Sequence, residues 1–188
     1  MQNKSIVTTG LGFAALIATM LIIVPASAQQ SASADDSITM FSKSLTSVPD
    51  TAMLTNEGAF YVPAFSSIRM EGGRTRLDLA VTLSIHNTSE TKALVLNRID
   101  YFDTSGTLVQ HFLTQAIALR PFGTVEIFIS RDDIRGGTGA NFFIGWAAIG
   151  PIAEPIIETV MVGSVGTNSY SFTTQGRAIR IVPPKTVQ

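Results

Sequence analysis

The first candidate for chemistry in this 188-residue chain is a glycine-rich stretch, RGGTGANFFIGW, at residues 135–146. Gly136, Gly137 and Gly139 could bring backbone N–H groups close to a phosphate. A phosphate-binding glycine loop opens a helix, so that its N–H groups and the helix dipole meet the anion together. Here Asn-Phe-Phe-Ile-Gly-Trp follows, which favours a strand, and no Lys-Ser or Lys-Thr pair is present. We therefore interpret the stretch as a turn that leads into a strand.

Metal-binding side chains are few. Asp132 and Asp133 precede the glycine loop and could bind calcium together with loop carbonyls, because a hard cation favours oxygen ligands. The D-x-D-x-D-G spacing of a dedicated calcium loop is absent, and loop aspartates commonly form turns and caps. His86 and His111 are the two histidines, and neither has an acidic residue at ligand spacing. The sequence therefore predicts no metal site and no cofactor, with both histidines solvated on strands.

The sequence contains no clear motif for nucleophilic catalysis either. Ser164 lies in VGSVG, which lacks the first glycine of the G-x-S-x-G elbow, and it is interpreted as part of a loop between strands. A hydrolase also needs a base with a supporting acid, and the sequence assigns none. Arg177 is interpreted as the structural partner of an acidic residue across the sheet, such as Asp100 or Glu158.

A candidate interaction loop remains around the glycines. The uncharged run at residues 136–153 favours a central strand that is covered on both faces, and an exposed apolar patch for a partner is the alternative. Asn141 at the loop's exit can hydrogen-bond loop backbone. The residues of this candidate contact surface, with no catalytic role assigned, are Asp132, Asp133, Gly136, Gly137, Gly139, Asn141, Trp146 and Arg177.

The elements that must position these residues are strands. Residues 76–86, RLDLAVTLSIH, alternate apolar and polar with a period of two, which indicates a strand with one buried face. Turn signals occur at Gly72-Gly73, at 103–106 and at 120–123. About eight short strands separated by such turns predict an all-β, immunoglobulin-like antiparallel β-sandwich, and a barrel is the alternative.

The ends of the chain differ from this domain. Residues 1–28 combine Lys4, an uncharged apolar run and Ala-Ser-Ala, the pattern of a secretory signal peptide, with an uncleaved membrane anchor as the alternative. Residues 29–58 are polar and predict a flexible spacer with one short ordered piece near 38–45. The β-sandwich is expected over 59–182, and 183–188 form a tail. The protein is thus expected to be exported, either periplasmic or secreted.

The amino-acid composition further limits the classes of protein and site that this chain can form. The chain has no cysteine, so it has no disulfide, no thiolate nucleophile and no thiolate metal site. Loss of Lys4 with the leader would leave 12 basic against 14 acidic side chains, which is unlike a nucleic-acid-binding surface. Contact with a membrane is expected only if the leader is left uncleaved.

Six ordered blocks of the sequence resemble a bacterial family catalogued only as domain of unknown function 3124. They are YVPAFSSI, LAVTLSIHNTS, IDYFDTSGTLV, GGTGANFFIGW, PIIETVMVG and SFTTQGRAI. The resemblance covers about residues 60–180 and implies a small exported or lipid-anchored protein. It implies no activity and no site residue.

Three functions are compatible with this sequence. The favoured one is a non-enzymatic module of the cell envelope that binds a protein or a glycan with a sheet face or its end loops. The alternative is a hydrolase or metal-dependent enzyme whose site is assembled only by the fold. A third is an assembly subunit that offers an edge strand to a neighbour.

Overall fold

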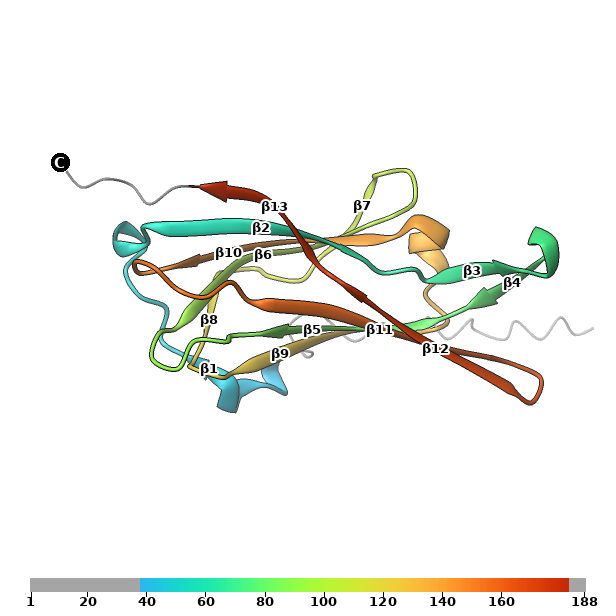
Figure 1. Ribbon diagram of the computed structural model, residues 1–188, viewed down its shortest axis with the longest axis horizontal. Helices are drawn as coiled ribbons and strands as arrows, with labels where there is room; N and C mark the ends of the chain where they lie inside the picture. Colours follow the sequence, from blue (N-terminus) through green and yellow to red (C-terminus); the bar gives the residue numbers. More distant parts are fainter. Residues whose placement is uncertain (1–37, 183–188) are drawn as a thin grey trace, which may run out of the picture.

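The structure is a computed structural model that describes residues 38–182, and these residues form an all-β fold. Two antiparallel sheets lie one above the other with the core between them (Figure 1). No helix in residues 38–182 is long and apolar enough to cross a membrane. The expected signal peptide at 1–28 and the tail at 183–188 lie outside the described residues.

The larger sheet has seven strands. Its order is β1 (Leu45–Thr46), β8 (Ile117–Leu119), β6 (Leu94–Phe102), β10 (Asn141–Ala148), β2 (Asn56–Pro63) and β13 (Arg177–Val182), and β7 (Leu108–His111) also pairs with β6. Strand β10 pairs along its length with β2 and with β6. The prediction of a central strand after the glycine loop is therefore confirmed.

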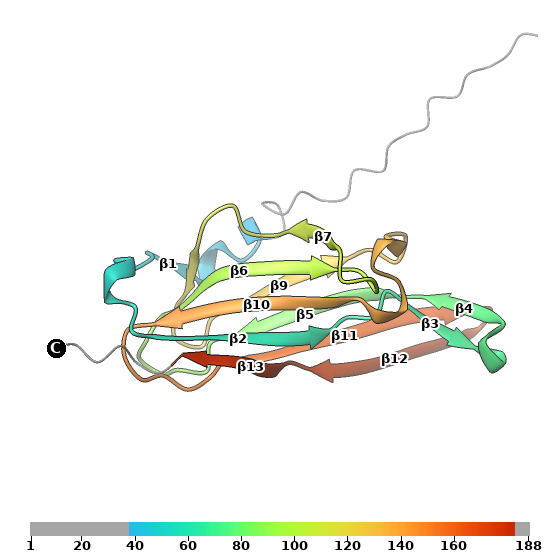
Figure 2. The same ribbon diagram turned by 90° about the horizontal axis from the view of Figure 1, so that it is seen from above.

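The smaller sheet has four strands, in the order β12 (Asn168–Gln175), β11 (Ile156–Val165), β5 (Ala80–His86) and β9 (Thr124–Ile129). A separate hairpin joins β3 (Ser67–Met70) to β4 (Thr75–Asp78). At the C-terminal end the chain leaves β12, passes Gly176 and continues as β13, so one extended segment crosses from the smaller sheet to the larger one (Figure 2).

Apolar alternation explains the core. The inward side chains predicted for residues 76–86 are all buried: Leu77, Leu79, Val81, Leu83 and Ile85. On β10 the inward residues Phe142, Ile144 and Trp146 belong to the same core cluster, and that cluster draws side chains from both sheets. With no disulfide available, this burial and the backbone ladders hold the fold together.

The predicted turns are confirmed at the level of hydrogen bonds. Asp103 opens the β6–β7 turn, where its carboxylate accepts from the N–H groups of Ser105 and Thr107, both at 2.8 Å. Gly106 closes this turn with a φ of 81°. Between β3 and β4, Gly72 and Gly73 have φ values of 67° and 87°, which glycine adopts without strain.

The structure also corrects the sequence interpretation. The described residues form thirteen strands where about eight were expected. Strands β2 and β3, and likewise β4 and β5, are separate where one strand each was expected, and the short strands β1 and β8 were not expected. The short ordered piece expected near 38–45 is present, since a 3-10 turn spans Ser42–Ser44 and β1 begins at Leu45. The flexible spacer expected from there to residue 58 is wrong, since β1 pairs with β8 and β2 begins at Asn56 instead of Ala59. Ser164 lies within β11, so its assignment to a loop is wrong as well.

Candidate functional site

The glycine loop is a structural corner. It forms a 3-10 turn, Ile134–Gly139, and strand β10 follows it directly. Several of its backbone groups are hydrogen-bonded within the protein: Thr104 Oγ1 donates to the Gly136 carbonyl at 3.0 Å and accepts from the Gly139 N–H at 2.9 Å. The Gly137 carbonyl accepts from the Ser66 N–H and hydroxyl, both at 3.1 Å. The prediction of a turn instead of a phosphate loop is confirmed.

The two loop aspartates do not converge on one point. Asp133 receives two side-chain hydrogen bonds from Arg135, at 2.8 and 2.7 Å, while Asp132 is exposed. Hydrogen bonding from Arg135 lowers the pKa of Asp133. The stabilisation from this pair is therefore present above the ordinary carboxyl pKa and is lost as the pH falls through the lowered value. Within residues 38–182 no group of three His, Asp or Glu residues could hold a metal ion.

The remaining residues of the candidate interaction loop are dispersed. Asn141 donates a 3.3 Å hydrogen bond to the Gly139 carbonyl, as its predicted role at the loop exit requires. Trp146 is 3% exposed and belongs to the core, so its inclusion in a contact surface is wrong. Arg177 lies on β13 opposite Tyr61 of β2, away from the loop. Among the described residues Arg177 forms no ion pair, and neither predicted partner, Asp100 or Glu158, contacts it.

A buried carboxylate on the outer side of the larger sheet has the partners that sequence reasoning missed. Asp100 is 2% exposed, and it pairs with Arg98 on its own strand and with His111 Nδ1 at 2.7 Å across the β6–β7 hairpin. The Arg98 guanidinium also lies over the Phe143 ring, 4.4 Å from its centroid. His111 is exposed on its strand, as expected, but the expectation that it has no acidic neighbour is wrong.

The His111–Asp100 contact resembles the orientation of a general base by an acid. Such a base acts on a nucleophile, yet in the described part of the chain Asp100 is the one side chain that hydrogen-bonds to the His111 ring. Asp100 itself is shared with Arg98. This arrangement neutralises a buried charge, and a reaction centre would need a further group that is not placed here.

A groove opens at one end of the smaller sheet, on its outer face. Its volume is about 550 Å³, within the range of small-molecule sites. The lining comes from four separate segments, the ends of β5 and β12, the start of β11 and the turn before β9: His86, Asn87, Thr88, Phe122, Ile156, Glu158 and Gln175. None of these residues belongs to the interaction loop that the sequence indicated.

The groove has one apolar wall and several polar groups. Phe122 is 69% exposed and Ile156 is 55% exposed, so both present apolar surface to solvent. His86 is hydrogen-bonded through Nδ1 to the Thr124 hydroxyl at 2.9 Å, which fixes its ring. Among the described residues, the Glu158 carboxylate and the Gln175 amide form no hydrogen bond. These two groups are therefore available to a ligand.

Phe122 has an unusual backbone conformation. It occupies the third position of the Arg120–Gly123 turn with a φ of 56°, and the turn is closed by the Gly123 N–H at 2.8 Å from the Arg120 carbonyl. A large side chain in this left-handed region is strained, typically by about 1–3 kcal/mol. Glycine is the favoured residue at that position of a turn that begins with proline. A strained, exposed aromatic residue beside a groove is a candidate for a functional role.

This strain gives a testable prediction. Phe122→Gly is expected to raise the free energy of unfolding by about 1 kcal/mol, because glycine adopts positive φ freely and the ring contributes little burial. Thermal unfolding should show an increase in Tm of about 2–4 °C. The matched variant Phe128→Gly removes an exposed ring at normal φ on β9 and should lower Tm. Equal effects of the two variants would contradict the strain.

The fold is that of an all-β protein built from antiparallel sheets, with a groove on the outer face of the smaller one. The family model described as "Protein of unknown function (DUF3124)" matches residues 57–179, and the chain belongs to this family. No curated protein matches the chain. A solved structure described as "Crystal Structure of Thermotoga maritima 1070" is similar at 15% identity and a TM-score of 0.39. That match covers 64% of this chain and 92% of the other, and at this level it gives no information about function.

Proposed function

We propose that the protein is a non-enzymatic binding module of the cell envelope, of the immunoglobulin-like sandwich type, and that its groove binds an uncharged saccharide. The observation that carries the proposal is the exposed ring of Phe122 beside a groove in which the side chains of Glu158 and Gln175 form no hydrogen bond with another described residue. Export follows from the signal-peptide pattern at residues 1–28 and is part of the same proposal.

The chemistry of the lining favours a saccharide. A sugar ring has an apolar C–H face that stacks on an aromatic ring, and Phe122 with Ile156 offers such a wall. Its hydroxyls both donate and accept, which suits a carboxylate, an amide and an imidazole: Glu158, Gln175 and His86. No lysine or arginine lines the groove, and its one carboxylate would repel a phosphate or a carboxylate ligand. The ligand is therefore expected to carry no negative charge.

The same lining supports binding without catalysis. Glycoside hydrolysis uses two carboxyl groups on either side of the scissile bond. The groove has one, Glu158, and it contains no serine or cysteine nucleophile. The imidazole of His86 is oriented by a threonine hydroxyl instead of an acid.

Binding to an array of neutral oligosaccharides, followed by titration calorimetry of the positive compounds, tests the proposal. Phe122→Ala is expected to weaken binding about tenfold, since a stacked aromatic ring contributes on the order of 1.4 kcal/mol. Phe128→Ala removes a comparably exposed ring on the outer face of the same sheet outside the groove, and should leave affinity unchanged.

A third variant distinguishes a saccharide from a cationic ligand. Glu158→Gln keeps an oxygen acceptor, so saccharide affinity should fall only about threefold, whereas a cation held by the carboxylate and the ring would be lost. Loss of binding in Phe128→Ala, or no neutral saccharide bound by the unchanged protein, would overturn the proposal.

A further inference from the structure

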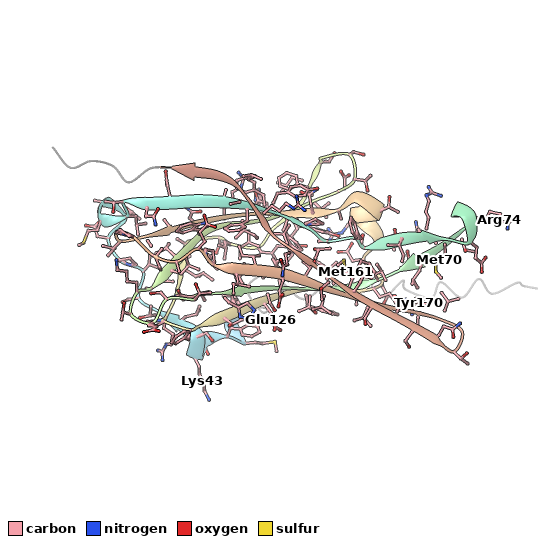
Figure 3. The ribbon with its side chains drawn as sticks, in the orientation of Figure 1. Lys43, Met70, Arg74, Glu126, Met161 and Tyr170 are labelled. Atoms are coloured by element: carbon pink, nitrogen blue, oxygen red, sulfur yellow. The ribbon has the colours of Figure 1, made fainter. Side chains whose placement is uncertain are left out.

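Strand β12 forms an open edge of the smaller sheet. It is the terminal strand of that sheet, paired on one side with β11 and on the other with no strand of the described chain. Its sequence, NSYSFTTQ, has no charged residue and no proline. The β11–β12 hairpin extends beyond the body of the molecule, where Tyr170 is labelled (Figures 1 and 3). A long uncharged edge of this kind is a template for pairing with another strand.

The other edges are protected in ways that β12 is not. Strand β13 carries Arg177, and charged side chains discourage edge pairing. At the opposite side, β1 has two residues and β7 has four, and such short edge strands offer few backbone groups to a partner. Strand β9 carries Glu126 and is followed by Arg131. The difference marks β12 as the edge that is free to pair.

The backbone groups that face the open edge follow from the hairpin register. Val165 pairs with Asn168 across a two-residue turn, which makes them a hydrogen-bonded pair. Because such pairs alternate, the N–H and C=O groups of Ser169, Ser171 and Thr173 point away from β11. The 2.8 Å bond from the Gly176 N–H to the Ile157 carbonyl agrees with this alternation. Beyond Thr173 the strand is covered, since Thr174 donates to the Pro63 carbonyl of β2.

We propose that β12 pairs with β12 of a second copy of this chain, antiparallel and with the two-fold axis at Ser171. In this register Ser171 faces Ser171 of the second copy, and Ser169 faces Thr173. All of these open groups then form hydrogen-bonded pairs, and the two four-stranded sheets join into one.

The side chains of β12 are complementary to themselves in this register. On the inner face Tyr170 lies opposite Phe172 of the second copy, twice, and aromatic cross-strand pairs are favourable. Tyr170 is 36% exposed, and Phe172 already packs near Phe65 with ring centroids 6.3 Å apart. On the outer face serine and threonine hydroxyls meet, and no like charges are opposed. A charged ligand strand would find no such complement, which favours a second copy over a different partner.

One strand pair buries a small surface, so the association is expected to be weak and concentration-dependent. Sedimentation equilibrium of the purified protein over a concentration series should show the mean mass rising from one chain toward two. Ser171→Lys opposes two ammonium groups at the axis and should hold the mass at one chain throughout. Ser105→Lys places the same charge in the β6–β7 turn and should still dimerise. A unit mass for the unchanged protein at every concentration, or equal behaviour of the two lysine variants, would overturn the proposal.

The absence of cysteine makes the register itself testable. Ser171→Cys should crosslink to itself with a short bismaleimide, because facing Cα atoms in such a pair are about 5.5 Å apart. Ser169→Cys should not, because its own counterpart is about 13 Å away at 3.3 Å per residue. The double variant Ser169→Cys/Thr173→Cys should crosslink again. Crosslinking of Ser169→Cys alone, or a monomer in the double variant, contradicts pairing about Ser171, and neither result bears on saccharide binding in the groove.

Discussion

Replacing Gly136 with alanine is expected to lower the free energy of unfolding by about 3 kcal/mol, the upper end for overpacking a core. An alanine Cβ at this position would lie 2.0 Å from the Tyr101 hydroxyl oxygen and 2.6 Å from the Ala140 Cβ. Both neighbours are buried in the core. Tyr101 is fully buried against Phe142, with ring centroids 4.9 Å apart, and the Gly136 carbonyl is fixed by the Thr104 N–H at 2.9 Å.

Chemical denaturation compares this variant with a control at a second glycine. Gly106→Ala has no atom within 4 Å of the new Cβ but a φ of 81°, so it should cost only about 1 kcal/mol of backbone strain. The difference between the two variants therefore isolates the steric term. If Gly136→Ala were no more destabilising than Gly106→Ala, the close approach of Tyr101 would be wrong.

Tyr101→Phe is expected to restore part of the stability that Gly136→Ala loses. Among the described residues the Tyr101 hydroxyl is buried without a hydrogen-bond partner, and burial raises its pKa. The nearby Ser66 hydroxyl donates to the Gly137 carbonyl instead. Removing the phenol oxygen alone should be close to neutral, because no hydrogen bond is lost. Combined with Gly136→Ala it should recover part of the loss, since the ring carbon 2.7 Å from the new Cβ remains.

The three glycines of the loop, Gly136, Gly137 and Gly139, also show how much could be predicted from the sequence. Sequence reasoning predicted correctly that the corner is a turn, because aromatic and β-branched residues follow it where a helix would be needed. It attributed the glycines to backbone freedom, and that reason holds for Gly137, whose φ is 73°. Gly136 has a different reason, the space taken by Tyr101 from another strand. Local pattern carries no information about such a neighbour 35 residues away.

The groove could not be predicted from the sequence, for a related reason. The groove combines four chain segments, and its members carry no motif within any one of them. One signal was present: Phe122 stands where a Pro-x-Gly turn favours glycine. The apolar residues Ile156, Val160 and Val162 on β11 are exposed in the structure, and Ile156 lines the groove. Periodicity assigned these residues to a strand without showing which face lies in solvent.

The predicted ion pair of Arg177 was wrong because strand register determines which side chains face each other. Arg177 was expected to reach Asp100, but the chain crosses between sheets at Gly176 and places Arg177 opposite Tyr61. Asp100 meets His111 through the β6–β7 ladder, which contains an irregularity between Tyr101 and Phe102. A shift of one residue in that ladder would exchange the faces. Sequence alternation does not reveal such an irregularity.

The buried Asp100 carboxylate gives the second large prediction. Arg98→Met retains apolar contact with Phe143 but removes the main counter-charge, and it should lower the free energy of unfolding by about 2 kcal/mol. Asp100→Asn should cost less, about 1 kcal/mol, because the half-exposed Arg98 and the exposed His111 can both be solvated. The asymmetry follows from burial. Arg98 and His111 keep access to water when Asp100 is replaced, whereas the buried Asp100 carboxylate has no such access when Arg98 is replaced.

The double variant Arg98→Met/Asp100→Asn completes a thermodynamic cycle. Its loss in the free energy of unfolding should be no greater than that of Arg98→Met alone, since no buried charge is left without a partner. Urea denaturation at neutral pH measures all four proteins, and repetition at high salt separates this pair from a surface one, because salt screens buried pairs weakly. Additive losses, or a larger loss for Asp100→Asn than for Arg98→Met, would show that the guanidinium does not compensate the carboxylate, and that Asp100 is stabilised by another group.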